Sequence, residues 1–276
     1  MTIIPILLYH SVHTDPPDWI APFTVSPANF VRHIELIHES GRTAMTASDL
    51  VRALRHEIPL PERPVVVTFD DGFADFANAA AVLAEHLVPA TLYVTTGAMR
   101  GRGPLPDDMA LPAATMLDWS QLPELVEQGI EIGAHTHTHP QLDILRSPAA
   151  ADEIVRSKHM LEDALGREVP SFAYPHGFQS TRIRRLVADS GHHSACAVIN
   201  ALSSESDDPY ALARLTVRND TRSEDIAAWL SGDNARVAPH RERWRTTAWR
   251  CYRRMGAPGS GSGVIAHSKS QEAKEF

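Results

Sequence analysis

Two adjacent carboxylates stand at the end of a β-branched run in this chain. Residues 65–68, Val-Val-Val-Thr, have the composition of a short buried strand, and Asp70, Asp71 and Gly72 follow just after it. Catalytic residues of α/β proteins gather at strand ends, so the pair is a candidate site for chemistry. The same residues also suit a turn, because Asp-Gly is a common turn pair and Asp caps a following helix.

A second polar cluster follows another predicted strand. Residues 135–140 read His-Thr-His-Thr-His-Pro directly after the apolar run at 130–134. His135 and His139 are four residues apart, which places both rings on one face of a helical turn, and Pro140 favours an end to that turn. Alone, the hexapeptide also suits a polar surface loop in a chain with 15 histidines. Together with the carboxylates it predicts a metal site with positions open for water and substrate.

Strands and helices alternate about seven times along the chain, which predicts the scaffold for these residues. A parallel sheet with crossover helices follows, either as a barrel or as an open sheet. The Gly- and Pro-rich residues 97–118 form a long connection, of a length that is often functional. The predicted strands cover residues 3–9, 65–68, 90–95, 130–134, 172–174, 195–199 and 212–217, and the predicted helices begin at Ser26-Pro27 and Thr46 and cover 73–87, 120–128, 147–165, 181–190 and 223–230.

The alternation fades after residue 232. Residues 236–254 carry seven arginines together with two tryptophans and a tyrosine, which predicts a basic aromatic helix. Such a helix packs on the barrel, binds a partner, or lies on an acidic membrane surface. We therefore predict a catalytic domain over residues 1–232, the basic helix over 233–255 and a flexible Gly-Ser-rich tail over 256–276.

Composition narrows the functional classes. The net charge of −8 in 276 residues argues against nucleic acid as a partner. The two cysteines form no Cys-x-x-Cys motif, so neither a zinc finger nor a redox motif is predicted. The N-terminus has no basic leader, and no apolar run is long enough for a transmembrane segment. A cytoplasmic location is expected, or an extracytoplasmic one if the sequence is a processed form; no oligomeric state is predicted.

Residues 68–72, Thr-Phe-Asp-Asp-Gly, together with residues 135–140, resemble two motifs of the polysaccharide deacetylases of carbohydrate esterase family 4. Residues 5–11 and 172–177 are similar to further parts of the same family, and the resemblance spans about residues 3–231. It implies a distorted (β/α) barrel of about seven parallel strands. It also implies removal of an acetyl group from an N-acetylated carbohydrate with the help of a divalent metal.

The resemblance assigns roles to individual residues. It makes Asp70 the catalytic base, and Asp71, His135 and His139 the ligands of a divalent metal, most often zinc, with cobalt or nickel as alternatives. The chemistry is consistent, because a metal lowers the pKa of water, and a carboxylate accepts the proton that the water loses. The backbone N–H of His176 is expected to help hold the oxyanion.

The chain departs from the family pattern in its general acid. Many members carry this acid as a histidine in a late Leu-x-His motif, and no convincing match follows residue 200. Residues 8–10, Leu-Tyr-His, fit the motif at the end of the first predicted strand. Because a closed barrel places its first and last strands side by side, we expect His10 to be the general acid. The alternative is a histidine that caps the strand and holds a loop.

A second departure concerns the arginine that orients the catalytic carboxylate in many members. Ala173 stands at the matching position, and Arg214, within a predicted strand, is expected to act instead. A buried arginine needs a carboxylate partner, whereas the alternative is a surface arginine on an edge strand. Tyr174 and Trp119 are expected either to line the substrate pocket, where aromatic rings stack on sugars, or to pack in the core.

The leading functional prediction is a metal-dependent deacetylase acting on the N-acetyl group of an amino sugar in a polysaccharide, oligosaccharide or small glycoconjugate. One alternative is a related amidohydrolase with a non-sugar amide substrate. Another is a catalytically inactive carbohydrate-binding module on the same barrel. The presence of all four candidate residues, Asp70, Asp71, His135 and His139, argues against the inactive module.

Overall fold

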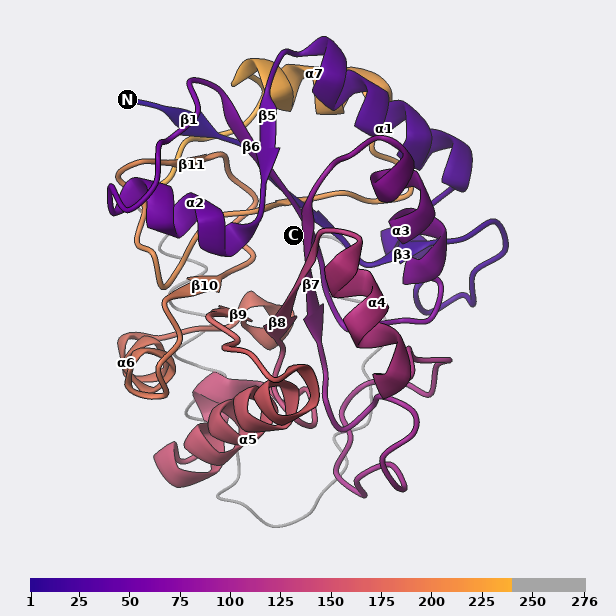
Figure 1. Ribbon diagram of the computed structural model, residues 1–276, viewed down its shortest axis with the longest axis vertical. Helices are drawn as coiled ribbons and strands as arrows, with labels where there is room; N and C mark the ends of the chain where they lie inside the picture. The colour runs from indigo at the N-terminus through magenta and orange to yellow at the C-terminus, as the bar shows by residue number, and fades with distance from the viewer. Residues whose placement is uncertain (240–276) are drawn as a thin grey trace.

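The centre of the molecule is one curled sheet of parallel strands. The computed structural model describes residues 1–239 (Figure 1). Seven strands follow one another in the order β10-β9-β8-β7-β6-β2-β12, and β5 pairs with the beginning of β6. Their bounds are β2 Ile6–Tyr9, β5 Thr43–Met45, β6 Pro64–Phe69, β7 Ala90–Val94, β8 Ile130–Ala134, β9 Ser171–Ala173, β10 Ser194–Cys196 and β12 Leu215–Thr216.

The two ends of this sheet meet. Leu215 of β12 pairs with Leu7 of β2, and Leu212, three residues earlier, bridges in parallel to Cys196 of β10. The Leu212 N–H donates to the carbonyl of Ala195, which reinforces this bridge. The sheet is therefore a distorted (β/α) barrel, as predicted, and its first and last strands lie side by side.

Helices surround the sheet, as Figure 1 shows. They pack on it through apolar faces, and the N-terminal caps predicted at Ser26 and Thr46 form, each side chain accepting an N–H from three residues later. The α-helices are α1 Pro27–Glu39, α2 Ala47–Leu54, α3 Phe76–Glu85, α4 Leu122–Glu127, α5 Ser147–Leu165, α6 Thr181–Asp189 and α7 Ser223–Ser231; the 3₁₀ helices are η1 Ala21–Phe23, η2 Trp119–Gln121, η3 Leu142–Ile144 and η4 Pro175–Gly177.

Because side chains point alternately to the two faces of each strand, the core has two parts. Val65, Val67 and Phe69 of β6 belong to the large apolar cluster between the sheet and the helices. Val66 belongs to a second cluster, with Tyr93 and residues of strands on the far side of the ring. These residues can meet only inside the barrel. Because parallel strands are buried on both faces, they appear in sequence as continuous apolar runs.

Several predicted boundaries need correction. The single strand predicted over residues 3–9 is interrupted at Pro5, because β1 Ile3–Ile4 leaves the barrel and pairs antiparallel with β11 Ser203–Ser204. The helix predicted from residue 73 begins at Phe76, since Phe73 instead bridges to Met116 in the long 97–118 connection. Four short strands, β5, β11, β3 Ser11–Val12 and β4 Thr24–Val25, were not predicted, because two or three residues show no periodicity.

The C-terminal prediction is wrong where the structure describes it. Residues 233–239 are not helical, since Leu202 pairs with Val237 and exchanges hydrogen bonds with Arg236 and Ala238. The remainder of the predicted basic helix and the 256–276 tail lie outside the described residues. Within residues 1–239, none of the helices has the length and apolar character needed to cross a bilayer.

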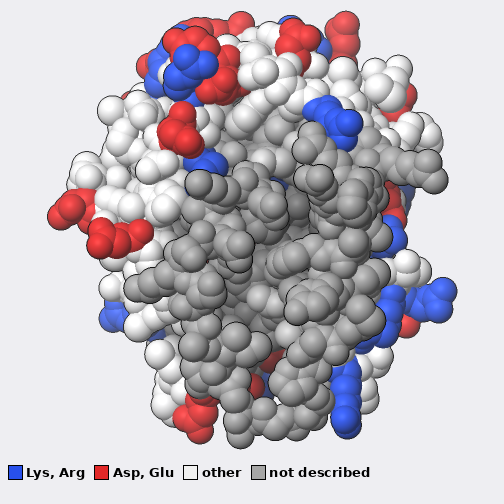
Figure 2. Space-filling model, turned by 180° about the vertical axis from the view of Figure 1, so that it is seen from behind, with Lys and Arg blue, Asp and Glu red and all other residues white. Residues whose placement is uncertain are grey.

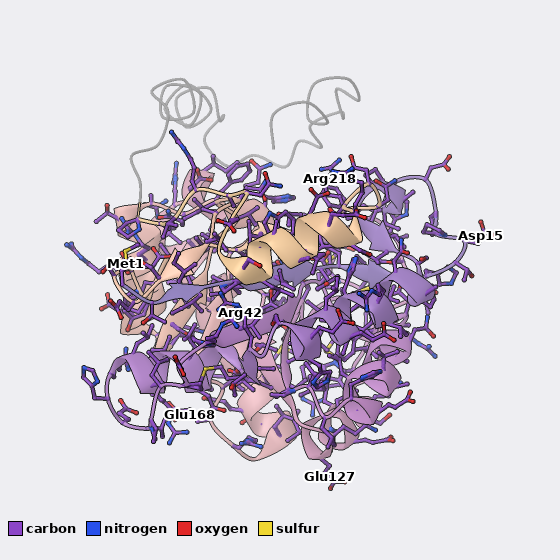
Figure 3. The ribbon with its side chains drawn as sticks, turned by 90° about the horizontal axis from the view of Figure 1, so that it is seen from above. Met1, Asp15, Arg42, Glu127, Glu168 and Arg218 are labelled. Atoms are coloured by element: carbon purple, nitrogen blue, oxygen red, sulfur yellow. The ribbon has the colours of Figure 1, made fainter. Side chains whose placement is uncertain are left out.

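Arg42 connects three elements at the end of the barrel opposite the candidate residues. Its guanidinium donates to the carbonyls of Leu230 at the end of α7, Ile3 of β1 and Pro64 of β6, at 2.5, 3.1 and 2.8 Å (Figure 3). Elsewhere on the surface, acidic and basic side chains of the described residues are interspersed around the face in Figure 2.

The packing inside the barrel generates a stability prediction. A Cβ added to Gly133 of β8 would overlap the ring of Tyr93 and lie 2.8 Å from Ser171 Oγ. Gly133→Ala should therefore lower the free energy of unfolding by about 1–3 kcal/mol, as overpacking does, measured by chemical denaturation. In a Tyr93→Leu background the same change should cost less. An equal cost in both backgrounds would contradict this account.

Candidate active site

The chemistry-bearing side chains gather at one end of the barrel. Asp70 and Asp71 follow β6, residues 135–139 follow β8, His176 lies in η4 after β9, and His10 follows β2. Because these strands are parallel, their carboxyl ends lie at the same rim. Residues separated by more than a hundred positions thus come together.

Asp71, His135 and His139 form a buried cluster of donor atoms. The Nε2 atoms of His135 and His139 lie 3.4 and 3.2 Å from Asp71 Oδ1. One donor atom from each residue lies within 4.8 Å of the others, and each residue is at most 6% exposed. One carboxylate oxygen and two imidazole nitrogens in this arrangement fit a divalent transition metal.

Neighbouring groups set the orientation and charge of these candidate ligands. Nδ1 of His135 lies 2.8 Å from the carbonyl of Ala173, to which its N–H donates, and this leaves Nε2 as the atom that faces Asp71. Burial opposes ionisation of Asp71, but hydrogen bonds from His135 and His139 outweigh it and hold the pKa of Asp71 well below its usual range. The carboxylate of Asp71 is therefore ionised at neutral pH.

Asp70 is held apart from this cluster by Arg214. Both Asp70 oxygens accept hydrogen bonds from the two terminal nitrogens of Arg214, each at 2.7 Å. Arg214 is fully buried, and it also donates to the Ala197 carbonyl at 3.0 Å and the Thr68 hydroxyl at 3.3 Å. Burial favours a neutral Asp70, but the charges of Arg214 and His135 outweigh it and lower the pKa of Asp70. Asp70 is thus a fixed, ionised carboxylate whose Oδ2 lies 3.9 Å from His135 Nε2.

The two neighbouring carboxylates meet different partners because Asp70 continues the alternation of β6, whereas the chain turns at Asp71. Val66, Thr68 and Asp70 share the inward-facing phase of the strand, so Asp70 points into the barrel beside Arg214. Asp71 then turns the chain with a φ of 74°, and Gly72 follows at 87°. Gly72 suits this place, since a Cβ there would lie 3.1 Å from a Val94 methyl group.

The loop between His135 and His139 is not the helical turn that their spacing predicted. Thr136 and His139 have positive φ values of 66° and 62°, and the His139 N–H donates to Thr136 Oγ1 at 3.0 Å. Asp71 and His176 also have positive φ, so four of the eight such non-glycine residues in 1–239 lie at this rim. Each costs about 1–2 kcal/mol, and such strain persists only where surrounding contacts enforce it.

His10 lies close to both carboxylates. Burial lowers the pKa of its ring, and the charges of Asp71 and Asp70 act in the opposite direction. The ring contacts Phe23, with centroids 5.3 Å apart, and its Nδ1 is buried without a hydrogen-bond partner among the described residues. The structure therefore brings His10 to the rim where Asp70 and the cluster of Asp71, His135 and His139 lie.

The aromatic residues occupy different places from those expected at a pocket. Tyr174 is fully buried, its ring packs on Phe172, and its hydroxyl donates to the Tyr210 carbonyl at 2.8 Å. Of the two alternatives expected for Tyr174, the structure shows packing in the core and not a place at the surface of a pocket. Trp119 is also buried, with Arg102 over its ring. His176, by contrast, is exposed and meets the His139 ring edge to face at 4.7 Å between centroids.

No sequence pattern had indicated Thr68 or the carbonyls of Ala173 and Ala197 as supports of the site. Thr68 could have been found from its phase, because it lies two residues before Asp70 on an alternating strand. The two carbonyls had no signal, since a backbone group is the same in every residue.

A sequence model of a protein family, described as polysaccharide deacetylase, matches residues 57–195, half of the chain. The chain belongs to the polysaccharide deacetylase family. The family resemblance predicted from residues 68–72 and 135–140 is thereby confirmed. Membership makes the protein a hydrolase of the deacetylase type, with an acetylated carbohydrate as the class of substrate.

Several known proteins are similar to this family member. YxkH of Bacillus subtilis (strain 168), whose name assigns it to the polysaccharide deacetylases, is 23% identical over 228 residues, 82% of this chain and 76% of its own. The structure of Streptococcus pyogenes deacetylase PplD in complex with acetate has a TM-score of 0.72 at 24% identity, over 82% of this chain and 96% of that one. IcaB from Ammonifex degensii has a TM-score of 0.69 at 22% identity, covering 83% and 97%. These structures share the fold.

This deacetylase-family chain differs from the expected pattern at Ala173, where the resemblance leads one to expect an arginine. Ala173 is buried and contributes its carbonyl to His135. Arg214 contacts Asp70 from just before β12 instead, which is the partnership that the sequence suggested.

The buried ion pair generates a prediction for stability. Arg214→Met should lower the free energy of unfolding of the metal-free protein by about 3–5 kcal/mol, because Asp70 would remain as an unpaired buried charge. Urea denaturation measures this loss. Adding Asp70→Asn should recover part of it, since no charge is then left unpaired. A double variant no more stable than Arg214→Met would contradict the prediction.

Proposed function

We propose that this protein is a metal-dependent deacetylase that hydrolyses the N-acetyl amide of an amino sugar to a free amine and acetate. One observation carries the proposal: two adjacent carboxylates have different partners. Asp71 faces two imidazoles, whereas Asp70 is held by Arg214 beside them. Family membership supports the same reaction class.

The ligand residues fit the proposed metal. Asp71, His135 and His139 would hold the ion, with zinc as the best match to this donor set and cobalt or nickel as alternatives. Such an ion, when bound, lowers the pKa of a water molecule and polarises a carbonyl oxygen. The carbonyl of Ala173 keeps the His135 ring in the tautomer that presents Nε2 to the ion.

Asp70 is proposed as the general base. Its carboxylate is ionised and both its oxygens are held by Arg214, so it is positioned to take a proton from the attacking water. The backbone N–H of His176 is proposed to stabilise the oxyanion, which its place beside His139 supports.

His10 is proposed as the general acid. Protonated His10 would give its proton to the amine nitrogen as the carbon–nitrogen bond breaks, and the product amine leaves neutral. Its place beside the two carboxylates supports this role. Burial makes the imidazolium a stronger acid than one in water, which favours donation to the departing amine.

Acetate release tests the proposed function directly. The metal-free protein, reloaded with zinc, cobalt or nickel, should release acetate from an N-acetylglucosamine oligomer or from small N-acetylated aminoglycosides. Asp71→Ala should abolish metal binding and activity, whereas Asp70→Asn should keep stoichiometric metal and lose activity by about 10²–10⁴-fold. Elemental analysis of each purified variant gives the metal content.

Two results would refute this assignment. If the wild-type chain binds no divalent metal, the metal-dependent mechanism is wrong. If the loaded protein binds these sugars but releases no acetate, the chain is a binding module; acetate released only from non-sugar amides would assign it to a related amidohydrolase.

The role of His10 has its own prediction. His10→Ala should lower kcat by about 10²–10⁴-fold and leave the metal content unchanged, because it removes a proton donor and no ligand. His159→Ala, an exposed position on α5, is the matched histidine control and should retain full turnover. Turnover of His10→Ala near the wild-type value would leave His10 with the loop-holding role only.

A further inference from the structure

Glu153 of α5 reaches into the loop that joins the two histidine ligands. Its Oε2 accepts the backbone N–H groups of both His137 and Thr138 at 2.8 Å, and its Oε1 accepts the Thr138 hydroxyl at 2.8 Å. Glu153 touches neither His135 nor His139 in these contacts. It acts on the backbone between them.

The other side of the same loop is held by backbone groups of the 96–110 segment. The carbonyls of Thr136, His137 and Thr138 accept N–H groups at 3.2, 2.9 and 2.8 Å. The donors are Thr96, Gly97 and Ala110, in that order. Within residues 1–239, Glu153 is the one side chain outside the loop that accepts its backbone N–H groups. The loop is therefore held between α5 and the 96–110 segment.

The conformation of this loop needs such support. Thr136 and His139 have positive φ, which costs energy for a β-branched residue in particular. Strained backbone of this kind persists only where neighbouring contacts enforce it. Without Glu153, two buried N–H groups would lose their acceptor, and relaxation of the loop would move His139 relative to His135.

We propose that Glu153 is a positioning residue that keeps His135 and His139 in the metal-binding arrangement. The proposal rests on the metal site of the proposed function. Outer groups that orient metal ligands typically contribute 10–100-fold to metal affinity.

The bonding pattern separates the effect of geometry from that of charge. Both N–H groups go to the same oxygen, so the carbonyl of a glutamine can accept both, while its amide donates to the Thr138 hydroxyl. Glu153→Gln therefore removes the charge and keeps the bonds. Glu153→Asp keeps the charge but is shorter by one methylene and loses the reach. Glu153→Ala loses both.

Metal affinity is the decisive measurement. We expect zinc affinity, measured by competition with a chelator in the full chain, to fall about 10–100-fold in Glu153→Ala and Glu153→Asp. Glu153→Gln should stay within a few-fold of wild type. Asp152→Ala, an exposed neighbour on α5 that makes none of the three bonds, is the matched control and should bind zinc normally.

The visible absorption of bound cobalt provides a second readout, because it reports ligand geometry. It should change in the Asp and Ala variants and match wild type in the Gln and Asp152→Ala variants. Circular dichroism and thermal denaturation of the metal-free proteins check that each variant folds. If Glu153→Ala does not fold, the contrast between the Asp and Gln variants carries the test.

The outcomes distinguish this inference from the proposed function. Wild-type protein without metal affinity would refute the proposed metal site itself. Wild-type binding with unchanged affinity in both Glu153→Ala and Glu153→Asp would overturn the role of Glu153 alone. A Gln variant as weak as the Ala variant would also overturn it, since charge and not loop geometry would then be the cause.

Discussion

The buried ion pair between Arg214 and Asp70 is the interaction on which the rest of this site depends. Arg214 is fully buried, and a charged side chain is tolerated inside a barrel only when it is paired and fully hydrogen-bonded. Asp70 neutralises it, while Thr68 and the Ala197 carbonyl accept its other N–H groups. These partners come from β6 and from the residues after β10, so one side chain joins strands that are distant in sequence.

The same ion pair separates two adjacent carboxylates by their partners. Two neighbouring aspartates repel each other, and each needs its own source of positive charge to remain ionised in a buried place. Arg214 supplies it for Asp70, whereas Asp71 relies on the rings of His135 and His139. The positive φ of Asp71 makes this division possible, because it directs the second carboxylate out of the strand and toward the histidines.

The rim as a whole is held by surrounding structure and not by local preference. Non-glycine residues with positive φ gather in the loops after β6, β8 and β9. Around the histidine loop, Glu153 of α5 binds the backbone on one side and the 96–110 segment binds it on the other. A rigid barrel with enforced loops at its rim meets the requirement that a metal site keep its ligands oriented.

The sequence alone predicted where the strands end, which residues are candidate ligands, and the family. All three predictions depend on short motifs that directly follow apolar runs, so the residues concerned are adjacent in the chain. The resemblance also assigned different roles to Asp70 and Asp71, and that assignment stays a prediction. Tertiary structure decided what depends on distant partners. It buried the Tyr174 ring in the core, replaced an expected helical turn at residues 135–139 with a strained loop, and brought Arg214 to Asp70. The local sequence pattern indicates the period of a strand or a helix. It does not indicate that Arg214, 144 positions after Asp70, becomes its partner, because the two residues meet only when the barrel closes.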